Sequence, residues 1–84
     1  MNLEELRKQI DEIDLAMMDL FKKRMQVSFL IGEYKKTHKL PVLDMNREQE
    51  ILENRKLALH DDHLWPLYKD FIKEVMRLSK VNQT

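Results

Sequence analysis

The sequence predicts an all-α protein with three helices, the first of them very long, in a single domain of residues 1–84. Apolar residues recur at alternating spacings of three and four from residue 3 to residue 34, which is typical of a helix that packs along one stripe. Turn-forming residues are scarce, because the 84 residues include one glycine and two prolines. Hydrophobic residues make up 43% of the chain, which is too many for a disordered one.

The first helix is predicted over residues 3–37. Its apolar stripe consists of Leu3, Leu6, Ile10, Ile13, Met17 and Leu20, and the same spacing continues to Arg24, Val27, Ile31 and Tyr34. Gly32 weakens this helix by about 1 kcal/mol relative to alanine. The helix is expected to end within residues 37–41, because the residue before Pro41 is held out of the helical region.

The length of this helix indicates a second chain. A helix of about 35 residues is ~52 Å long, whereas a compact chain of this size has a radius of gyration of ~12 Å and a diameter of roughly 30 Å. The helix must therefore extend beyond the rest of the chain, with its apolar stripe facing water. Because a second copy would cover that stripe most simply, we expect an intertwined homodimer.

Two shorter helices follow. The second is expected to start at Asp44 or Asn46, either of which can cap a helix N-terminus, and to run to about His60. A loop at residues 61–63 leads to the third helix, with Pro66 in its first turn, where the missing N–H costs little. One face of the third helix carries Tyr68, Ile72, Val75, Ser79 and Gln83.

Composition excludes several classes of function. The chain has no cysteine, so disulfides, thiolate metal sites and cysteine nucleophiles are excluded. Its three histidines lack the spacing of helical metal ligands, and we expect neither metal nor cofactor. With 15 basic and 15 acidic residues the chain shows no basic excess for nucleic acid. No apolar run approaches the ~20 residues of a membrane span and no signal peptide is visible, so a cytoplasmic location is expected.

Polar residues on apolar faces are candidates for either an internal ion pair or a binding site. Arg24 occupies a position in the stripe of the first helix, and Lys35 lies eleven residues further along, on nearly the same side. Ser79 and Gln83 continue the apolar face of the third helix. Because a buried cation without a counter-charge is costly, Arg24 either pairs with a carboxylate such as Glu48 or binds an anion. The pattern alone leaves both possibilities open.

The remaining polar positions also have ordinary explanations. The acidic and basic residues at positions 44–48 suit the dipole at a helix start, and Lys35 could extend to solvent near a helix end. Arg7 lies seventeen residues before Arg24, or ~25 Å along a straight helix. One chain therefore cannot grip a small molecule with both guanidinium groups, whereas an antiparallel partner helix could bring Arg7 of one subunit toward Arg24 of the other.

Four segments carry a family resemblance. They are Leu6-Arg7-x-x-Ile10-Asp11-x-x-Asp14, Arg24 followed by Gly32-Glu33-Tyr34-Lys35, Pro41-Val42-Leu43-Asp44-Met45-Asn46-Arg47-Glu48, and Ser79-x-x-x-Gln83. In this order and at this spacing they resemble the small all-helical chorismate mutases, the AroQ class, over essentially the whole chain. The visible departure is a slightly short loop between the second and third helices.

The resemblance implies an isomerase that rearranges chorismate to prephenate in phenylalanine and tyrosine biosynthesis, without cofactor or metal. It implies two active sites per homodimer, each receiving Arg7 from the partner subunit. Lys35 and Gln83 would face the ether oxygen of the substrate. The two carboxylates would be held by Arg7, Arg24 and Ser79, with help from Lys35.

The start of the second helix would bind the rest of the substrate. Glu48 would accept a hydrogen bond from the ring hydroxyl, with the backbone of Asp44 nearby, and Arg47 would line the site and neutralise Glu48. The complete set of motifs leads us to expect a stand-alone chain, with a pathway enzyme as a possible partner. The alternative that the chain is the mutase part of a larger enzyme stays open.

Two other functions compete with the mutase. An isochorismate–pyruvate lyase on the same fold also runs a pericyclic reaction, but the intact segment from Asp44 to Glu48 favours the mutase. A non-catalytic helical dimerisation module would use the apolar stripe alone. Replacement of Arg24 by methionine separates these classes, because a scaffold would keep its stability whereas an enzyme would lose its activity.

Overall fold

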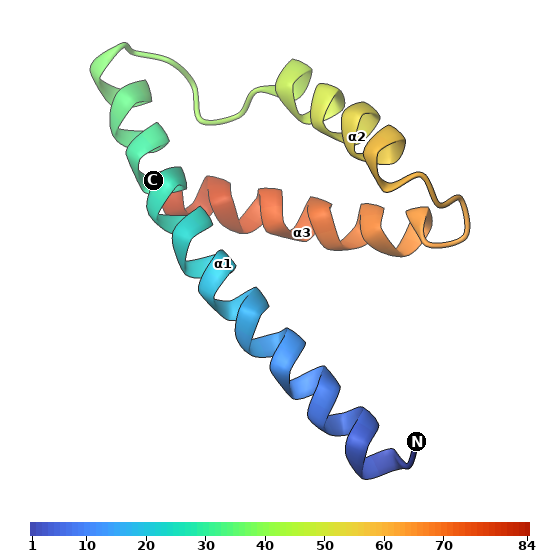
Figure 1. Ribbon diagram of the computed structural model, residues 1–84. Coiled ribbons are helices and arrows are strands. Elements are labelled where there is room, and N and C mark those ends of the chain that lie inside the picture. The colour runs from blue at the N-terminus through green and yellow to red at the C-terminus, as the bar shows by residue number, and fades with distance from the viewer.

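The computed structural model describes residues 1–84 and consists of three helices with no strand. The helices are α1 (Leu3–Thr37), α2 (Met45–Leu59) and α3 (Trp65–Gln83). In Figure 1, α1 runs diagonally as one unbroken helix, the C-terminal end of α3 meets the C-terminal half of α1, and α2 lies above α3. The predicted all-α class and the three predicted helices are confirmed.

Both ends of α1 fall where the sequence predicts them. Asn2 caps the N-terminus, where its side chain accepts a hydrogen bond of 2.9 Å from the backbone N–H of Glu5. At the other end, the chain leaves the helix after Thr37, and Lys39 adopts a left-handed φ of 54°. The helix is therefore bounded by a side-chain cap at its start and by a backbone reversal before Pro41 at its end.

The starts of α2 and α3 are fixed by two aspartates. Asp44, rather than Asn46, caps α2, since its Oδ1 accepts a hydrogen bond of 3.0 Å from the backbone N–H of Arg47. The Oδ1 of Asp61 accepts hydrogen bonds of 3.0 Å from the backbone N–H groups of His63 and Leu64, just before α3. Pro66 lies in the first turn of α3, as the sequence predicts.

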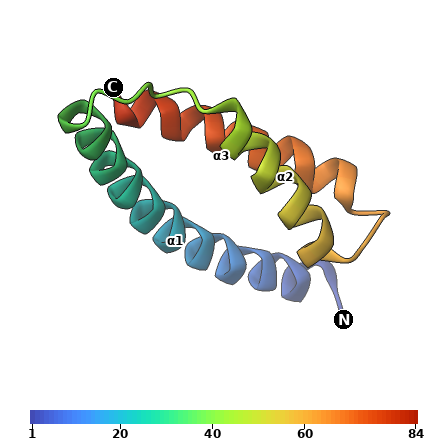
Figure 2. The ribbon, with the colours of Figure 1, turned by 90° about the horizontal axis from the view of Figure 1, so that it is seen from above.

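A single chain has almost no hydrophobic core. Five of the 84 residues are buried, and only two of these, Ile72 and Met76, are large and apolar. The chain extends over 54 × 26 × 16 Å with a radius of gyration of 15.9 Å, compared with ~12 Å for a compact chain of this length. Helix α3 contacts both α1 and α2, so the small core lies along α3. Figure 2 shows α2 beside α3 and the long rod of α1 opposite them.

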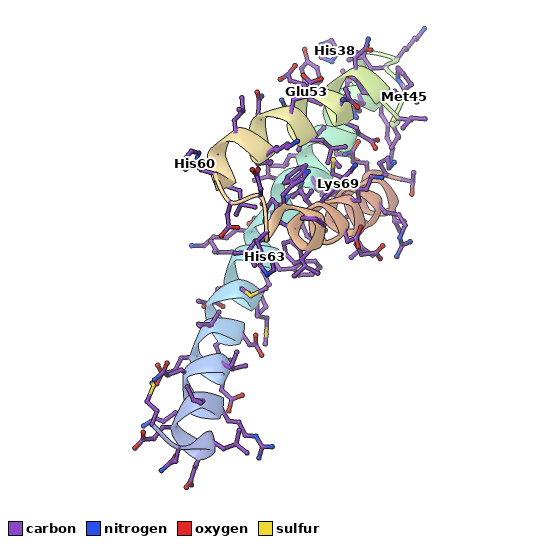
Figure 3. The ribbon with its side chains drawn as sticks, turned by 90° about the vertical axis from the view of Figure 1, so that its right-hand side faces the viewer. His38, Met45, Glu53, His60, His63 and Lys69 are labelled. Carbon is purple, nitrogen blue, oxygen red and sulfur yellow. The ribbon has the colours of Figure 1, made fainter.

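The N-terminal half of α1 projects away from the other helices, as Figure 3 shows. Each residue of the apolar stripe predicted for this half is 43–63% exposed, namely Leu3, Leu6, Ile10, Ile13, Met17 and Leu20. The overhang expected from the sequence is therefore present. The homodimer that would cover the stripe stays a prediction. None of the three helices combines the length and the apolar character needed to cross a bilayer.

Candidate active site

A cavity of about 370 Å³ lies where the C-terminal half of α1, the start of α2 and the C-terminal half of α3 come together. Seven of the eight predicted site residues line it, namely Arg24, Lys35, Asp44, Arg47, Glu48, Ser79 and Gln83. Four cationic and two anionic side chains are among its lining residues. This excess of positive charge suits a small molecule with two negative charges.

Arg24 lies in the part of the cavity between α1 and α3, and its Nη1 donates a hydrogen bond to Ser79 Oγ. The Ser79 hydroxyl donates in turn to the carbonyl of Val75 at 2.8 Å, and the Ser28 hydroxyl donates to the carbonyl of Ser79 at 2.9 Å. Arg24 forms no ion pair with a carboxylate. Of the two possibilities left open by the sequence, the internal ion pair with Glu48 is therefore not formed.

The environment of Arg24 disfavours its positive charge. Partial burial lowers the pKa of the Arg24 guanidinium, the nearby cation Arg55 lowers it further, and Tyr68 opposes the shift. A guanidinium remains protonated throughout the accessible pH range, so Arg24 keeps its positive charge. The lowered pKa shows that no nearby negative charge compensates it. A bound anion would supply this compensation.

Lys35 and Gln83 form a second polar pair at the other end of the cavity. Lys35 Nζ donates hydrogen bonds to the carbonyl of Val42 at 2.8 Å and to Gln83 Oε1 at 2.9 Å. Since the ammonium group can only donate, this contact fixes the orientation of the Gln83 amide. The Nε2 of Gln83 makes no hydrogen bond to the protein and is left to donate to a ligand.

Gly32 permits the close approach of α3 to α1 at this point. A Cβ on Gly32 would lie 2.6 Å from the carbonyl oxygen of Gln83 and 2.8 Å from its Cα. No other residue fits there without displacing the end of α3. The sequence shows the cost of this glycine within the helix and its place in a family motif, but not this contact, because the approach of two helices cannot be inferred from the spacing along one of them.

The ion pairs at the start of α2 differ from those expected. Glu48 Oε2 accepts a hydrogen bond of 3.0 Å from Lys80 Nζ on α3, whereas Arg47 Nη1 donates to Glu50 Oε1 at 2.6 Å. The expectation that Arg47 neutralises Glu48 is therefore wrong for this chain. Successive residues of a helix point about 100° apart, so Arg47 faces Glu50 one turn along rather than its neighbour.

Lys80 is the one cation lining the cavity that the sequence analysis did not single out. It follows Ser79 on α3 and lines the same cavity. Its position next to a predicted site residue was the available signal, but its pairing with Glu48 depends on how α2 and α3 cross. Asp44 lines the cavity as well, while its side chain caps α2.

Arg7 lies outside the cavity, as expected. It is exposed on the N-terminal part of α1, and the seventeen residues that separate it from Arg24 correspond to ~25 Å of helix. No group of three or more histidine, cysteine, aspartate or glutamate side chains in the chain is arranged to hold a metal ion. Figure 3 shows His38, His60 and His63 at three separate places.

Comparisons with known proteins identify the family of this chain. A family model described as chorismate mutase type II matches residues 6–84. The T-protein of Enterobacter agglomerans is 34% identical over 82 residues, which cover 96% of this chain and 22% of the relative. The bifunctional chorismate mutase/prephenate dehydratase of Aquifex aeolicus is 33% identical over 86 residues, covering 93% of this chain and 24% of the relative.

A third relative is shorter. The 4-amino-4-deoxychorismate mutase of Streptomyces pristinaespiralis is 31% identical over 82 residues, covering 92% of this chain and 64% of the relative. This chain thus spans between about a fifth and two thirds of the length of these relatives. No solved structure gives a significant match. Because the family model matches nearly the entire sequence, the chain belongs to the chorismate mutase type II family.

Proposed function

We propose that this chain catalyses the rearrangement of chorismate to prephenate, with residues 1–84 acting as one mutase domain. The observation that carries the proposal is Arg24, a partly buried cation without a carboxylate partner in a cavity with excess positive charge. Chorismate carries two carboxylates and would supply the missing negative charge. An isomerase of this kind fits the family to which the chain belongs.

The reaction requires positioning and electrostatic stabilisation rather than a nucleophile. The ether C–O bond breaks while a C–C bond forms in the same molecule, and no proton is transferred. The protein must therefore hold the compact conformer of the substrate and stabilise the negative charge that develops on the ether oxygen.

Lys35 and Gln83 are the proposed donors to the ether oxygen. The Lys35 ammonium group is held by Val42 and Gln83, and the amide nitrogen of Gln83 is left as a donor. Because these groups are oriented before the substrate binds, they need little reorganisation as charge develops. The close packing of Gly32 against the Gln83 backbone supports this placement.

The remaining residues would bind the ends of the substrate. Arg24, oriented by Ser79, would hold one carboxylate, and Arg7 of the partner subunit would hold the other with help from Lys35. Glu48 Oε1, which accepts no hydrogen bond from the protein, would accept one from the ring hydroxyl. Asp44 and Arg47 would complete the wall of the site at the start of α2.

The proposed active form is a homodimer, supported by the exposed stripe on α1 and by the distance of Arg7 from the cavity. The names of the longer relatives include a prephenate dehydratase activity in one case, which supports a pathway enzyme as a functional partner. A cytoplasmic location and independence from metal ions and cofactors stay predictions.

The test is to mix the purified protein with chorismate, to follow the loss of the diene absorbance, and to identify the product. We expect prephenate from the unmodified chain and conversion at least about a hundredfold slower by Arg24→Ala. An Arg24→Met variant should retain or gain thermal stability, because it removes a poorly compensated charge. A folded dimer that leaves chorismate unchanged would refute the proposal, and conversion of isochorismate instead would assign the lyase.

A further inference from the structure

We infer that Lys80 determines substrate specificity, by making the site prefer a neutral hydroxyl over an ammonium group at the ring position that faces Glu48. The inference rests on the proposed function, which places the ring hydroxyl against Glu48. It concerns a residue that belongs to none of the motifs of the sequence.

The pair formed by Lys80 and Glu48 differs from the other ion pairs of the chain. It joins two helices, whereas the other three pairs each join residues one turn apart on one helix. Its side chains are 32% and 30% exposed, compared with 52–60% for the others. It is also the pair in which both members line the cavity. An ion pair that is partly withdrawn from water affects its surroundings more strongly than an exposed one.

The pair leaves Glu48 with one free oxygen and a compensated charge. Lys80 occupies Oε2 at 3.0 Å, and Oε1 accepts no hydrogen bond from the protein. A ligand hydroxyl can donate to Oε1 without meeting an opposing charge. An ammonium group at the same position would be attracted by Glu48 and repelled by Lys80, so its charge would bring little net gain to offset its loss of hydration.

Removal of the Lys80 charge would shift this preference toward the ammonium group. With an apolar side chain at position 80, Glu48 would be an uncompensated carboxylate, which an ammonium group matches and a hydroxyl does not. The repulsion between two positive unit charges about 6 Å apart, at an effective dielectric constant of about 20, weakens binding by roughly a hundredfold. Because the pair is about one-third exposed, solvent screening should reduce this to about tenfold.

A purely structural role for Lys80, as a clip between α2 and α3, makes a different prediction. Loosening of the two helices would lower turnover of any substrate, and the ratio between two substrates would not change. The discriminating quantity is therefore the ratio of kcat/KM for two compounds that differ only in this ring substituent. Chorismate and 4-amino-4-deoxychorismate, which carries an ammonium group in place of the hydroxyl, are such a pair.

The experiment measures kcat/KM for both compounds with the unmodified protein, Lys80→Met and Lys80→Arg. Lys80→Gln serves as a second neutral variant in case the methionine variant folds poorly. Arg77→Met is the matched control, since it removes an exposed ion pair with Glu74 on the same helix, away from the cavity. We expect the unmodified protein to prefer chorismate and both neutral variants to shift the ratio toward the amino compound by about tenfold. Lys80→Arg and Arg77→Met should leave the ratio unchanged.

Equal loss of both activities in the neutral variants would overturn the role of Lys80 while leaving the proposed function intact. A preference of the unmodified protein for the amino compound would also overturn the role of Lys80. Binding of both compounds to the unmodified protein is measured by titration calorimetry. If the unmodified protein neither converts nor binds either compound, the proposed function fails, and this inference fails with it.

Discussion

The two halves of α1 belong to one continuous helix but meet opposite surroundings. The C-terminal half packs against α3 and contributes Arg24, Ser28 and Lys35, polar side chains that point into the cavity or its wall. The N-terminal half carries an apolar stripe that lies exposed within one chain. A polar group on the packed face and an apolar group on the free face are both unfavourable in an isolated chain. Each half therefore indicates something that one chain does not contain, a ligand in the first case and a partner in the second.

The largest expected effect concerns the C-terminal half of α1, which is proposed to bind the ligand. Arg24→Ala should lower kcat/KM for chorismate by roughly a hundredfold to several thousandfold, the loss expected when a charged contact of about 3–5 kcal/mol is removed. Thermal unfolding should change little, because Arg24 has no ion-pair partner in the chain. Arg77→Ala, on the outer face of α3, provides the control, and similar losses in the two variants would argue against a specific role for Arg24.

A second substitution tests the charge at the other end of the cavity. In Gln83→Glu the new carboxyl would lie beside the Lys35 ammonium, which lowers the carboxyl pKa and keeps it negative at neutral pH. We expect a loss of about a hundredfold at pH 7, since a carboxylate opposes the negative charge developing on the ether oxygen. As the pH falls through the carboxyl pKa, protonation restores a donor and activity should rise.

The control for this substitution is Gln83→Ala, which removes the donor without adding a titratable group. Its activity should be low at all pH values. A pH–rate profile of Gln83→Glu that matches the profile of the unmodified protein would contradict the assigned role of Gln83.

A substitution in the N-terminal half of α1 tests whether a partner chain covers the apolar stripe. Ile13→Glu places a charge in the middle of the exposed stripe, where burial of each large apolar side chain would otherwise contribute about 1.5–3 kcal/mol. We expect activity that depends on protein concentration, together with a shift toward monomers in sedimentation experiments. Glu12→Gln, an adjacent exposed substitution, should leave the assembly unchanged. A dimer that tolerates the charge at position 13 would place the interface elsewhere.

The smallest effect concerns the contact between the two helices. Gly32→Ala should favour helix formation in α1 by up to about 1 kcal/mol, yet its Cβ would lie 2.6 Å from the Gln83 carbonyl. We expect kcat to fall by about tenfold with KM nearly unchanged, since a displaced Gln83 loses stabilisation that is made mainly in the transition state. Glu33→Ala is the neighbouring control, and unchanged kcat in Gly32→Ala would show that α3 adapts without cost.

Much of the fold could be predicted from the sequence, because its determinants are local. The stripe spacing and Pro41 bound α1, Asp44 caps α2, and Pro66 marks the start of α3. Polar groups that interrupt an apolar face point to Arg24, Lys35, Ser79 and Gln83, all of which line the cavity. The resemblance supplies the roles of Arg7 and of the residues at the start of α2.

What could not be predicted depends on how the helices cross. The pairing of Lys80 with Glu48 and the contact of Gly32 with Gln83 each join positions more than thirty residues apart. The resemblance implies that Arg47 neutralises Glu48, whereas the helical geometry directs Arg47 to Glu50. Spacing along one helix carries no information on the two contacts between helices, Lys80 with Glu48 and Gly32 with Gln83.

Subunit mixing tests whether the two halves of α1, from two different chains, meet in one active site. Arg7→Ala and Arg24→Ala are each expected to be nearly inactive alone. After unfolding and refolding together, about half of the dimers should contain one chain of each kind, and one site in each mixed dimer would hold both arginines. We therefore predict recovery of about a quarter of the unmodified activity. A mixture as inactive as its components, or an Arg7→Ala variant that is fully active alone, would contradict the account.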